Sequence, residues 1–328
     1  MSKNNASLLE AARSGDIKRV QTFLSTGASA SVNDKDGTTA LMFAANSGFT
    51  EIVKALIDSG ANIDYKRKRY GLTALMLACA AKQLDIVRIL IAKGADINAI
   101  NEDGSTALMI AALKGYNQIV KALVDARANV NLQDKDGDTA LQLAVKQGHY
   151  NVVETLLKAG ADINIRGEQD DNLLILAAEN AYLEVVEILL ANNININEKN
   201  LDGETALSVA VAAGNTDIVE VLLHKNADVN KRNNLGDTPL LVAALQGYST
   251  IVKGLITKGA DVETTNLEET PLTLATIQGN AETVKVLLEN GADANTPLKD
   301  GKTLLIEATK RNFKTITQEL LAHGADVN

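Results

Sequence analysis

Residues 236–262 read GDTPLLVAALQGYSTIVKGLITKGADV, and the features of this stretch decide the fold. Thr238 precedes an apolar run that begins at Pro239. Thr is favourable just before a helix, and Pro is tolerated at its first position. Gly247 ends this run, because glycine adopts the positive φ angles of helix ends without a steric penalty. A second apolar run leads to Gly259. The stretch therefore predicts two short helices joined by a tight turn, followed by a second turn.

The residue that begins this pattern recurs along the chain at steps of 32 to 34 residues. It is Thr in eight copies and Asn in one: Thr39, Thr73, Thr106, Thr139, Asn172, Thr205, Thr238, Thr270 and Thr303. The second helix recurs as well, with apolar pairs one turn apart that form one stripe per helix, as in Ile119-Val120 with Leu123-Val124. A period of this size indicates a stack of small similar units rather than the globular core of an enzyme.

Ten units fit one frame and make the chain a single repeat domain over residues 1–328. They span 1–33, 34–67, 68–100, 101–133, 134–166, 167–199, 200–232, 233–265, 266–297 and 298–328. Of the 23 glycines, 21 fall at three positions of this frame, as turns and helix ends require. Asn193 and Asn226 replace Gly at the last of these positions, and Asn tolerates the left-handed backbone region. One unit cannot bury its own apolar face, so neighbouring units are expected to stabilise one another.

The pattern resembles the ankyrin repeat, whose consensus is Gly-x-Thr-Pro-Leu-His-x-Ala-Ala, then Gly-His, then Ile-Val-x-x-Leu-Leu-x-x-Gly-Ala-Asp-x-Asn. The match is fullest over 236–262, although the consensus His after Leu is absent from every unit. The resemblance implies an all-α solenoid of stacked helix-turn-helix units with projecting β-hairpin loops. It also implies a concave face, formed by loop tips and first helices, that binds proteins and has no catalytic activity. The sixth unit departs most, with Asp170, Asn172, Ala181 and Asn193 at consensus positions, and it is predicted to be a local bend or a weak point.

Composition narrows the class of function further. The net charge of −9 and the isoelectric point near 5.0 argue against a general nucleic-acid binder. No run of eighteen apolar residues is present, which predicts no membrane segment, and residues 1–5 lack the apolar core of a signal peptide. The single Cys79 lies in an apolar helical run, so we expect a buried packing residue and a reducing compartment. The sequence therefore favours a cytoplasmic monomer, with export as an effector without a cleavable signal left open.

No pattern in the chain predicts a catalytic, metal or cofactor site. His149, His224 and His323 fall in three different units without a partner at ligand spacing. Residues 134–138 faintly resemble a calcium loop, but the acidic residue required at its twelfth place is Val145. The consecutive Met42, Met76 and Met109 are predicted to fill gaps between repeats rather than to form a binding stripe. We therefore expect no enzymatic activity.

Two features remain as candidate binding sites. The first is a row of acids at the fifth frame position of five successive units: Asp138, Asp171, Glu204, Asp237 and Glu269. Such a row is either an anionic groove that attracts a basic segment or a solvated loop face on an acidic protein. The second is the only basic run, where the period is one residue longer: Tyr65, Lys66, Arg67, Lys68, Arg69 and Tyr70. It is either a binding finger, for an acidic protein segment or another anion, or a solvated loop tip.

The sequence thus leads to one main hypothesis and two alternatives. The main hypothesis is a rigid scaffold that binds a partner protein, with the acidic row holding a basic segment. The first alternative is a binder of an anionic ligand or nucleic acid through residues 65–70. The second is a self-assembling structural protein, in which the basic run of one copy pairs with the acidic row of another.

Overall fold

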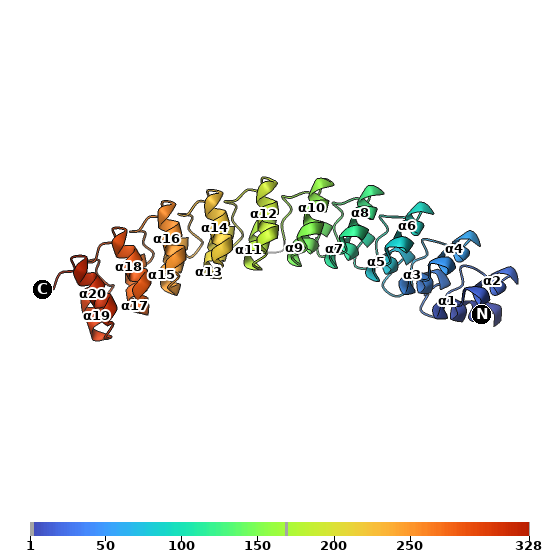
Figure 1. The fold of residues 1–328 in the computed structure, drawn as a ribbon, viewed down its shortest axis with the longest axis horizontal. Coiled ribbons are helices and arrows are strands. Elements are labelled where there is room, and N and C mark those ends of the chain that lie inside the picture. Colours follow the sequence, from blue (N-terminus) through green and yellow to red (C-terminus); the bar gives the residue numbers. More distant parts are fainter. Residues whose placement is uncertain (1–2, 168–169, 328) are drawn as a thin grey trace. The chain divides into compact units, whose positions relative to one another are not determined.

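A computed structural model describes residues 3–167 and 170–327 of the chain. It forms two compact units, Met1–Ile165 and Arg166–Asn328, referred to below as unit 1 and unit 2. Each unit is an all-α stack of helix pairs, as the repeat pattern predicts (Figure 1).

Unit 1 contains five helix pairs. Within it the first helices of consecutive pairs pack on one another, as do the second helices, so the unit has two helical layers. Its helices are α1 (Lys3–Ser14), α2 (Ile17–Ser25), α3 (Ala40–Ser47), α4 (Thr50–Asp58), α5 (Ala74–Ala80), α6 (Leu84–Ala92), α7 (Ala107–Leu113), α8 (Asn117–Asp125), α9 (Ala140–Lys146) and α10 (Tyr150–Lys158).

Unit 2 contains five further pairs, stacked in the same way within the unit. Its helices are α11 (Leu173–Glu179), α12 (Leu183–Ala191), α13 (Ala206–Ala212), α14 (Thr216–His224), α15 (Pro239–Gln246), α16 (Ser249–Thr257), α17 (Pro271–Gln278), α18 (Ala281–Glu289), α19 (Leu304–Lys310) and α20 (Lys314–Ala322).

The first helix of each pair after α1 begins where the sequence pattern places it. The side chain of Thr39 accepts a hydrogen bond of 3.1 Å from the backbone N–H of Met42, and the other recurring Thr residues and Asn172 form the same cap. Such caps each stabilise a helix by about 1 kcal/mol. Because these first helices are only seven or eight residues long, they depend on caps and on packing rather than on intrinsic helix propensity.

The second helix of a pair ends in a left-handed residue. Gly60 and Gly94 have φ angles of +84° and +85° at this position. Asn193 and Asn226 have φ angles of +61° and +60°, which confirms their prediction as substitutes for glycine.

The core of each unit lies between the two helical layers and between successive pairs. Small first-helix residues such as Ala44 and Ala45 are fully buried, and so are the apolar pairs of the second helices, such as Val53 and Leu56. Each buried Val or Leu contributes about 1.5–3 kcal/mol relative to an exposed one. The expectation that the methionines fill gaps is confirmed, because Met42, Met76 and Met109 are each 1% exposed.

Cys79 is also buried within α5 and is not part of a disulfide. Burial raises the pKa of its thiol well above the ordinary range, because the thiolate would lose its hydration. Cys79 therefore acts as a packing residue, as the sequence predicts.

The loops between successive pairs contain little strand structure. In the described part of the chain they form only isolated antiparallel bridges, one of which joins Asn33 to Thr39 and another Asn266 to Glu269. Each loop is instead held by a bond across its base. For example, the backbone N–H of Asp134 donates to the carbonyl of Asp138 over 3.0 Å.

Candidate functional site

Two loops of unit 2, 200–204 and 233–237, are each closed by the side chain that begins them. The Asn233 side-chain oxygen accepts hydrogen bonds from the backbone N–H groups of Leu235 and Asp237, at 3.0 and 2.9 Å. Asn200 accepts in the same way from Asp202 and Glu204, at 3.1 and 2.9 Å. These turns fix the tip of each loop and the direction of the acidic residue that follows it.

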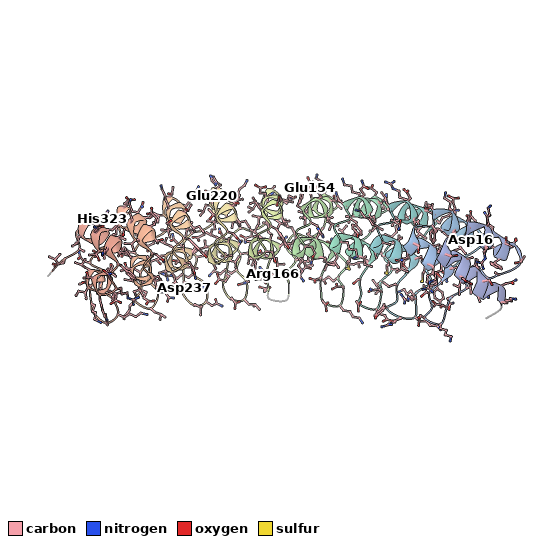
Figure 2. The ribbon with its side chains drawn as sticks, turned by 60° about the horizontal axis from the view of Figure 1, so that its bottom comes forward. Asp16, Glu154, Arg166, Glu220, Asp237 and His323 are labelled. Atoms are coloured by element: carbon pink, nitrogen blue, oxygen red, sulfur yellow. The ribbon has the colours of Figure 1, made fainter. Side chains whose placement is uncertain are left out.

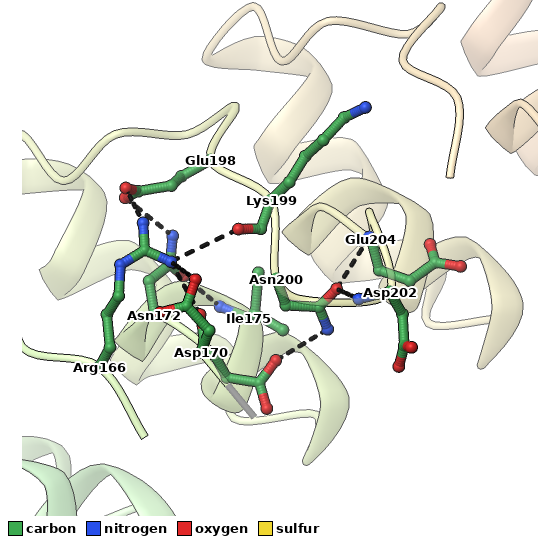
Figure 3. Close-up of polar contacts among 10 residues, drawn as sticks. Arg166, Asp170, Asn172, Ile175, Glu198, Lys199, Asn200, Asp202 and Glu204 are labelled. Carbon is green, nitrogen blue, oxygen red and sulfur yellow. Dashed lines mark hydrogen bonds and ion pairs between the residues drawn. The ribbon is translucent and has the colours of Figure 1, made fainter. Parts of the chain in front are cut away.

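Asn200 and Asn233, together with Asn266, also bind acids of the acidic row, for which the sequence had indicated no partners. Within unit 2 each side-chain amide donates to the acid of the preceding loop, over 2.6 to 2.8 Å: Asn200 to Asp171, Asn233 to Glu204, and Asn266 to Asp237. Figure 3 shows the Asn200 side chain between two successive loops. The row therefore has a structural role in unit 2, since its carboxylates join consecutive repeats.

The two remaining acids of the row have cationic partners. In unit 2, the Lys299 ammonium lies 3.3 Å from a carboxylate oxygen of Glu269. In unit 1, the Lys146 ammonium lies 2.6 Å from a carboxylate oxygen of Asp138, whose side chain is only 14% exposed. Each carboxylate of the row thus has at least one donor, which offsets the repulsion expected between like charges.

Cations at the ends of the repeats form a second set of inter-repeat contacts that sequence reasoning missed. Arg166 donates to the carbonyl of Lys199 and to the carboxylates of Asp170 and Glu198 (Figure 3). Lys199 donates in turn to the carbonyl of Arg232 over 2.7 Å, and Arg232 donates to the carbonyl of Thr265 over 2.8 Å. The recurrence of Lys or Arg at the last frame position is the sequence signal that could have revealed these contacts.

Three leucines at successive loop tips are among the most exposed large apolar side chains of unit 2. Leu201 is 66% exposed, Leu235 is 78% exposed and Leu267 is 75% exposed. All three lie in turns that also carry acids, and apolar side chains bring no benefit to a solvated turn. Repeated along one edge of the unit, they form an exposed apolar and acidic surface, which is typical of a binding site. Sequence reasoning missed them, although a Leu inside a polar turn is a readable signal.

Two hollows lie beside the loop tip that carries Leu267 in unit 2. The first has a volume of about 220 Å³ and is lined by residues that include Asp237, Leu245, Leu267 and Glu269. The second, of about 230 Å³, is lined by residues that include Glu268, Glu269 and Ile277. Because Glu269 lines both, the hollows adjoin one another on the side of the first helices and loops.

This surface lies on one edge of unit 2. Figure 2 shows Asp237 on the edge of the projecting loops and Glu220 of α14 on the opposite edge, where the second helices lie. We refer to the loop edge formed by Leu201, Leu235, Leu267 and the neighbouring acids as the loop-tip surface.

The basic run of unit 1 does not present its four cations together. The Lys66 ammonium donates to the carbonyl of Ile100 over 2.9 Å, which is the contact that Lys199 makes in unit 2. The Arg69 guanidinium lies over the ring of Tyr70, at 4.8 Å from its centroid. Arg67 begins the loop, since its N–H donates to the carbonyl of Leu72 as that of Asp34 does to Thr38. The extra residue therefore lies in the loop tip.

The remaining members of the run are placed around this tip. Tyr65 is half-buried, Lys68 is exposed, and Tyr70 is 45% exposed with a φ angle of +71°. The structure thus brings the six residues into one loop but gives them separate environments.

No candidate metal site appears in residues 3–167 and 170–327. No group of three or more His, Cys, Asp or Glu residues there could hold a metal ion. Outside Cys79, the shifted groups are exposed ion pairs. A hydrogen bond from Lys302 lowers the pKa of Asp300 and raises that of Lys302, and a hydrogen bond from Lys158 lowers the pKa of Glu154. None of the helices in this part of the chain is long and apolar enough to cross a membrane.

These repeated helix pairs, their caps and their loops define a class of repeat protein, and a comparison with family models gives its name. The model described as "Ankyrin repeats (3 copies)" matches residues 8–101, 95–167, 174–266 and 263–328. The chain therefore belongs to the ankyrin repeat family. No curated protein matches it in a sequence comparison.

Proposed function

We propose that the chain is a non-enzymatic scaffold that holds a segment of a partner protein on the loop-tip surface of unit 2. Ankyrin repeats are generally protein-interaction modules. The observation that carries the proposal is the row of three exposed leucines, the last of which lies beside two adjoining hollows. Partner binding would remove these leucines from water, and each Leu side chain that is fully buried contributes about 1.5–3 kcal/mol.

The charge of the surface favours a partner segment that is basic as well as apolar. Asp171, Glu204, Asp237 and Glu269 each use one oxygen for the inter-repeat contact, and neutral amides satisfy the first three without cancelling their charge. Exposed Glu268 adds to the charge at the hollows. Asp171 is buried, so Lys or Arg side chains of a partner are expected to face Glu204, Asp237, Glu268 and Glu269. These contacts are expected mainly to speed association.

The basic run is a secondary element of this proposal. Tyr65, Lys66, Arg67, Lys68, Arg69 and Tyr70 would add contacts to an acidic part of a partner. A nucleic-acid site at this loop is less favoured, because Lys66 is engaged by Ile100 and Arg69 by Tyr70. Asp138, in unit 1, is held by Lys146, and its contribution would be to the electrostatic field.

The proposal can be tested with labelled synthetic peptides and fluorescence polarisation. The panel comprises a Leu/Lys peptide, the same peptide with Glu in place of Lys, and one with Ser in place of Leu. We expect only the Leu/Lys peptide to bind. The double variant Leu235→Ser, Leu267→Ser is expected to weaken binding about tenfold or more, since two apolar contacts are lost.

Leu321→Ser provides the matched control. Leu321 lies on the second helix α20, is 46% exposed, and is not part of the loop-tip surface. Its variant should bind the Leu/Lys peptide as the unmodified protein does. Equal losses in the double variant and in Leu321→Ser, or equal binding of all three peptides, would contradict the proposal.

A further inference from the structure

Arg67 differs from every residue that begins a comparable loop in its unit. Asp34, Asn101 and Asp134 each turn a side-chain oxygen onto the backbone N–H groups of their own loop. Arg67 has no such oxygen, and it instead lines a pocket together with residues of the first three repeats. At the position where the other loops have a loop-closing side chain, this loop has an arginine that does not close it.

The pocket is open and is lined by two arginines. It has a volume of about 340 Å³ and is lined by residues that include Arg13, Arg67, Asp34, Asp36, Phe43 and Leu77. Arg13 comes from the first repeat and lies over the Phe43 ring, at 5.4 Å from its centroid. This contact holds one guanidinium in place at the pocket before any ligand arrives.

The Arg67 guanidinium has an unsatisfied donor. Its Nε atom is enclosed and has no hydrogen-bond partner in the described part of the chain. The only other such side-chain atoms there are the hydroxyls of Thr276 and Thr283, which are fully buried. Although Asp34 and Asp36 line the pocket, neither arginine is paired with a carboxylate in residues 3–167 and 170–327. Buried donors are nearly always satisfied, so this unpaired atom makes Arg67 an exception among the described side chains of unit 1.

The chemistry of the pocket selects the acceptor. The two terminal nitrogens of a guanidinium match the two oxygens of a planar carboxylate. A doubly charged phosphate would meet stronger repulsion from Asp34 and Asp36, because Coulomb energy scales with the charge of the ligand. Half-buried Phe43 and Leu77 provide an apolar wall for the carbon atoms beside the carboxylate.

We infer that this pocket of unit 1 is a carboxylate-binding site, in which Arg67 and Arg13 receive an acidic side chain or the terminal carboxylate of a partner protein. The site is separate from the loop-tip surface of unit 2 and does not depend on it.

The test follows the side-chain Nε–H signal of Arg67 by NMR in the full-length protein. The probes are N-acetyl-glutamate amide for a side-chain carboxylate, N-acetyl-leucine for a terminal carboxylate, and inorganic phosphate. N-acetyl-glutamine amide is the neutral control. We expect at least one carboxylate probe to shift the Arg67 signal saturably. The carboxylate probe that gives the larger shift identifies whether a side-chain or a terminal carboxylate is preferred. The neutral probe should leave the Arg67 signal unchanged.

Variants identify the site. Arg67→Gln should weaken binding of the carboxylate probe about tenfold or more, as followed on the Arg13 signal, because the bidentate contact is lost. Arg88→Gln is the matched control, since Arg88 is exposed on the second helix α6 of the same unit. The inference is overturned if neither carboxylate shifts the Arg67 signal of the unmodified protein. A stronger response to phosphate, or equal loss in Arg88→Gln, would overturn it as well.

Discussion

The loops of unit 1 and unit 2 form the same turn but close it with partly different side chains. In unit 1 the carboxylates of Asp34 and Asp134 and the amide oxygen of Asn101 accept the backbone hydrogen bonds. In unit 2 the amides of Asn200 and Asn233 do so, and their NH₂ groups then donate to the acids of the preceding loop. A carboxylate could perform only the first of these tasks, because it has no proton to donate.

The difference between the units therefore follows from the neighbouring repeat. Asp134 comes 29 residues after Ser105, which is uncharged, whereas Asn233 comes 29 residues after Glu204. Where the preceding loop carries an acid such as Glu204, an amide at the start of the next loop avoids the repulsion that a second carboxylate would add. Asp and Asn are thus equivalent within one loop but not between two loops.

The largest effect is expected from Arg166→Ala in unit 2. The substitution removes the donors to Asp170, Glu198 and Lys199 and leaves two carboxylates without this cation. We expect a loss of about 2 kcal/mol in the free energy of unfolding, measured by urea denaturation followed by circular dichroism. Gln133→Ala in unit 1 is the comparison, because Gln133 makes one neutral bond to Gly137, and its loss should cost about 0.5 kcal/mol. Equal losses would show that the charged contacts add nothing.

The exchange of amide for carboxylate is expected to have the next largest effect. Asn233→Asp keeps the oxygen that closes the loop but places a negative charge against Glu204, which should cost about 1–2 kcal/mol at neutral pH. Asn101→Asp is the matched control, since Leu72 stands at the corresponding place in the preceding loop, and its cost should stay below about 0.5 kcal/mol. The difference between the two variants should narrow toward about pH 4, as carboxyl groups take up protons. A difference that is independent of pH would contradict the electrostatic explanation.

A smaller effect is expected from Lys146→Gln in unit 1. The Lys146 ion pair with Asp138 is partly exposed, at 36% for the Lys side chain, so its contribution is about 0.5 kcal/mol and is screened by salt. Urea denaturation at low and high salt should show the loss only at low salt. The amide contacts of unit 2 are less sensitive to salt, so Asn266→Ala should destabilise to the same extent in both conditions. A salt-dependent loss in Asn266→Ala would remove this distinction.

The last prediction uses the reactivity of Cys79 to test whether unit 1 unfolds together with unit 2. Cys79 is the only cysteine and lies in unit 1, and burial raises the pKa of its thiol. The folded protein should therefore not react with a thiol reagent at about pH 8, because the thiolate is not formed. In Asn233→Asp, circular dichroism should report loss of structure at lower urea while Cys79 stays protected. Simultaneous exposure of Cys79 would mean that unit 1 unfolds together with unit 2.

Much of the fold could be predicted from the sequence because its determinants are local. Thr39 begins a helix through a bond to Met42, three residues away, and Asn193 ends one through its own backbone angle. Such signals do not depend on the placement of other repeats. The projecting loops that the sequence predicts as β-hairpins form isolated antiparallel bridges in the described part of the chain.

The candidate site could be predicted only in part, because its contacts join different repeats. The acids were found in the sequence, but their partners stand 29 residues further on, and the register between loops decides which side chains meet. The direction of Arg67 was also beyond the sequence, since the same basic run is compatible with a fully exposed finger. Its placement depends on the extra residue in the loop and on the pocket beside Phe43.

The amide-to-acid contacts restrict how the repeats of unit 2 can be rearranged. Duplication of residues 200–232 would preserve the chemistry, because the new copy would present Asn200 to the acid before it and Glu204 to the amide after it. Insertion of a repeat that begins with Asp, such as 134–166, behind Glu204 would set two carboxylates against each other. Gene duplication or protein engineering that lengthens this array must therefore copy a junction, with an acid on one side and an amide on the other, rather than a repeat chosen by its helices alone.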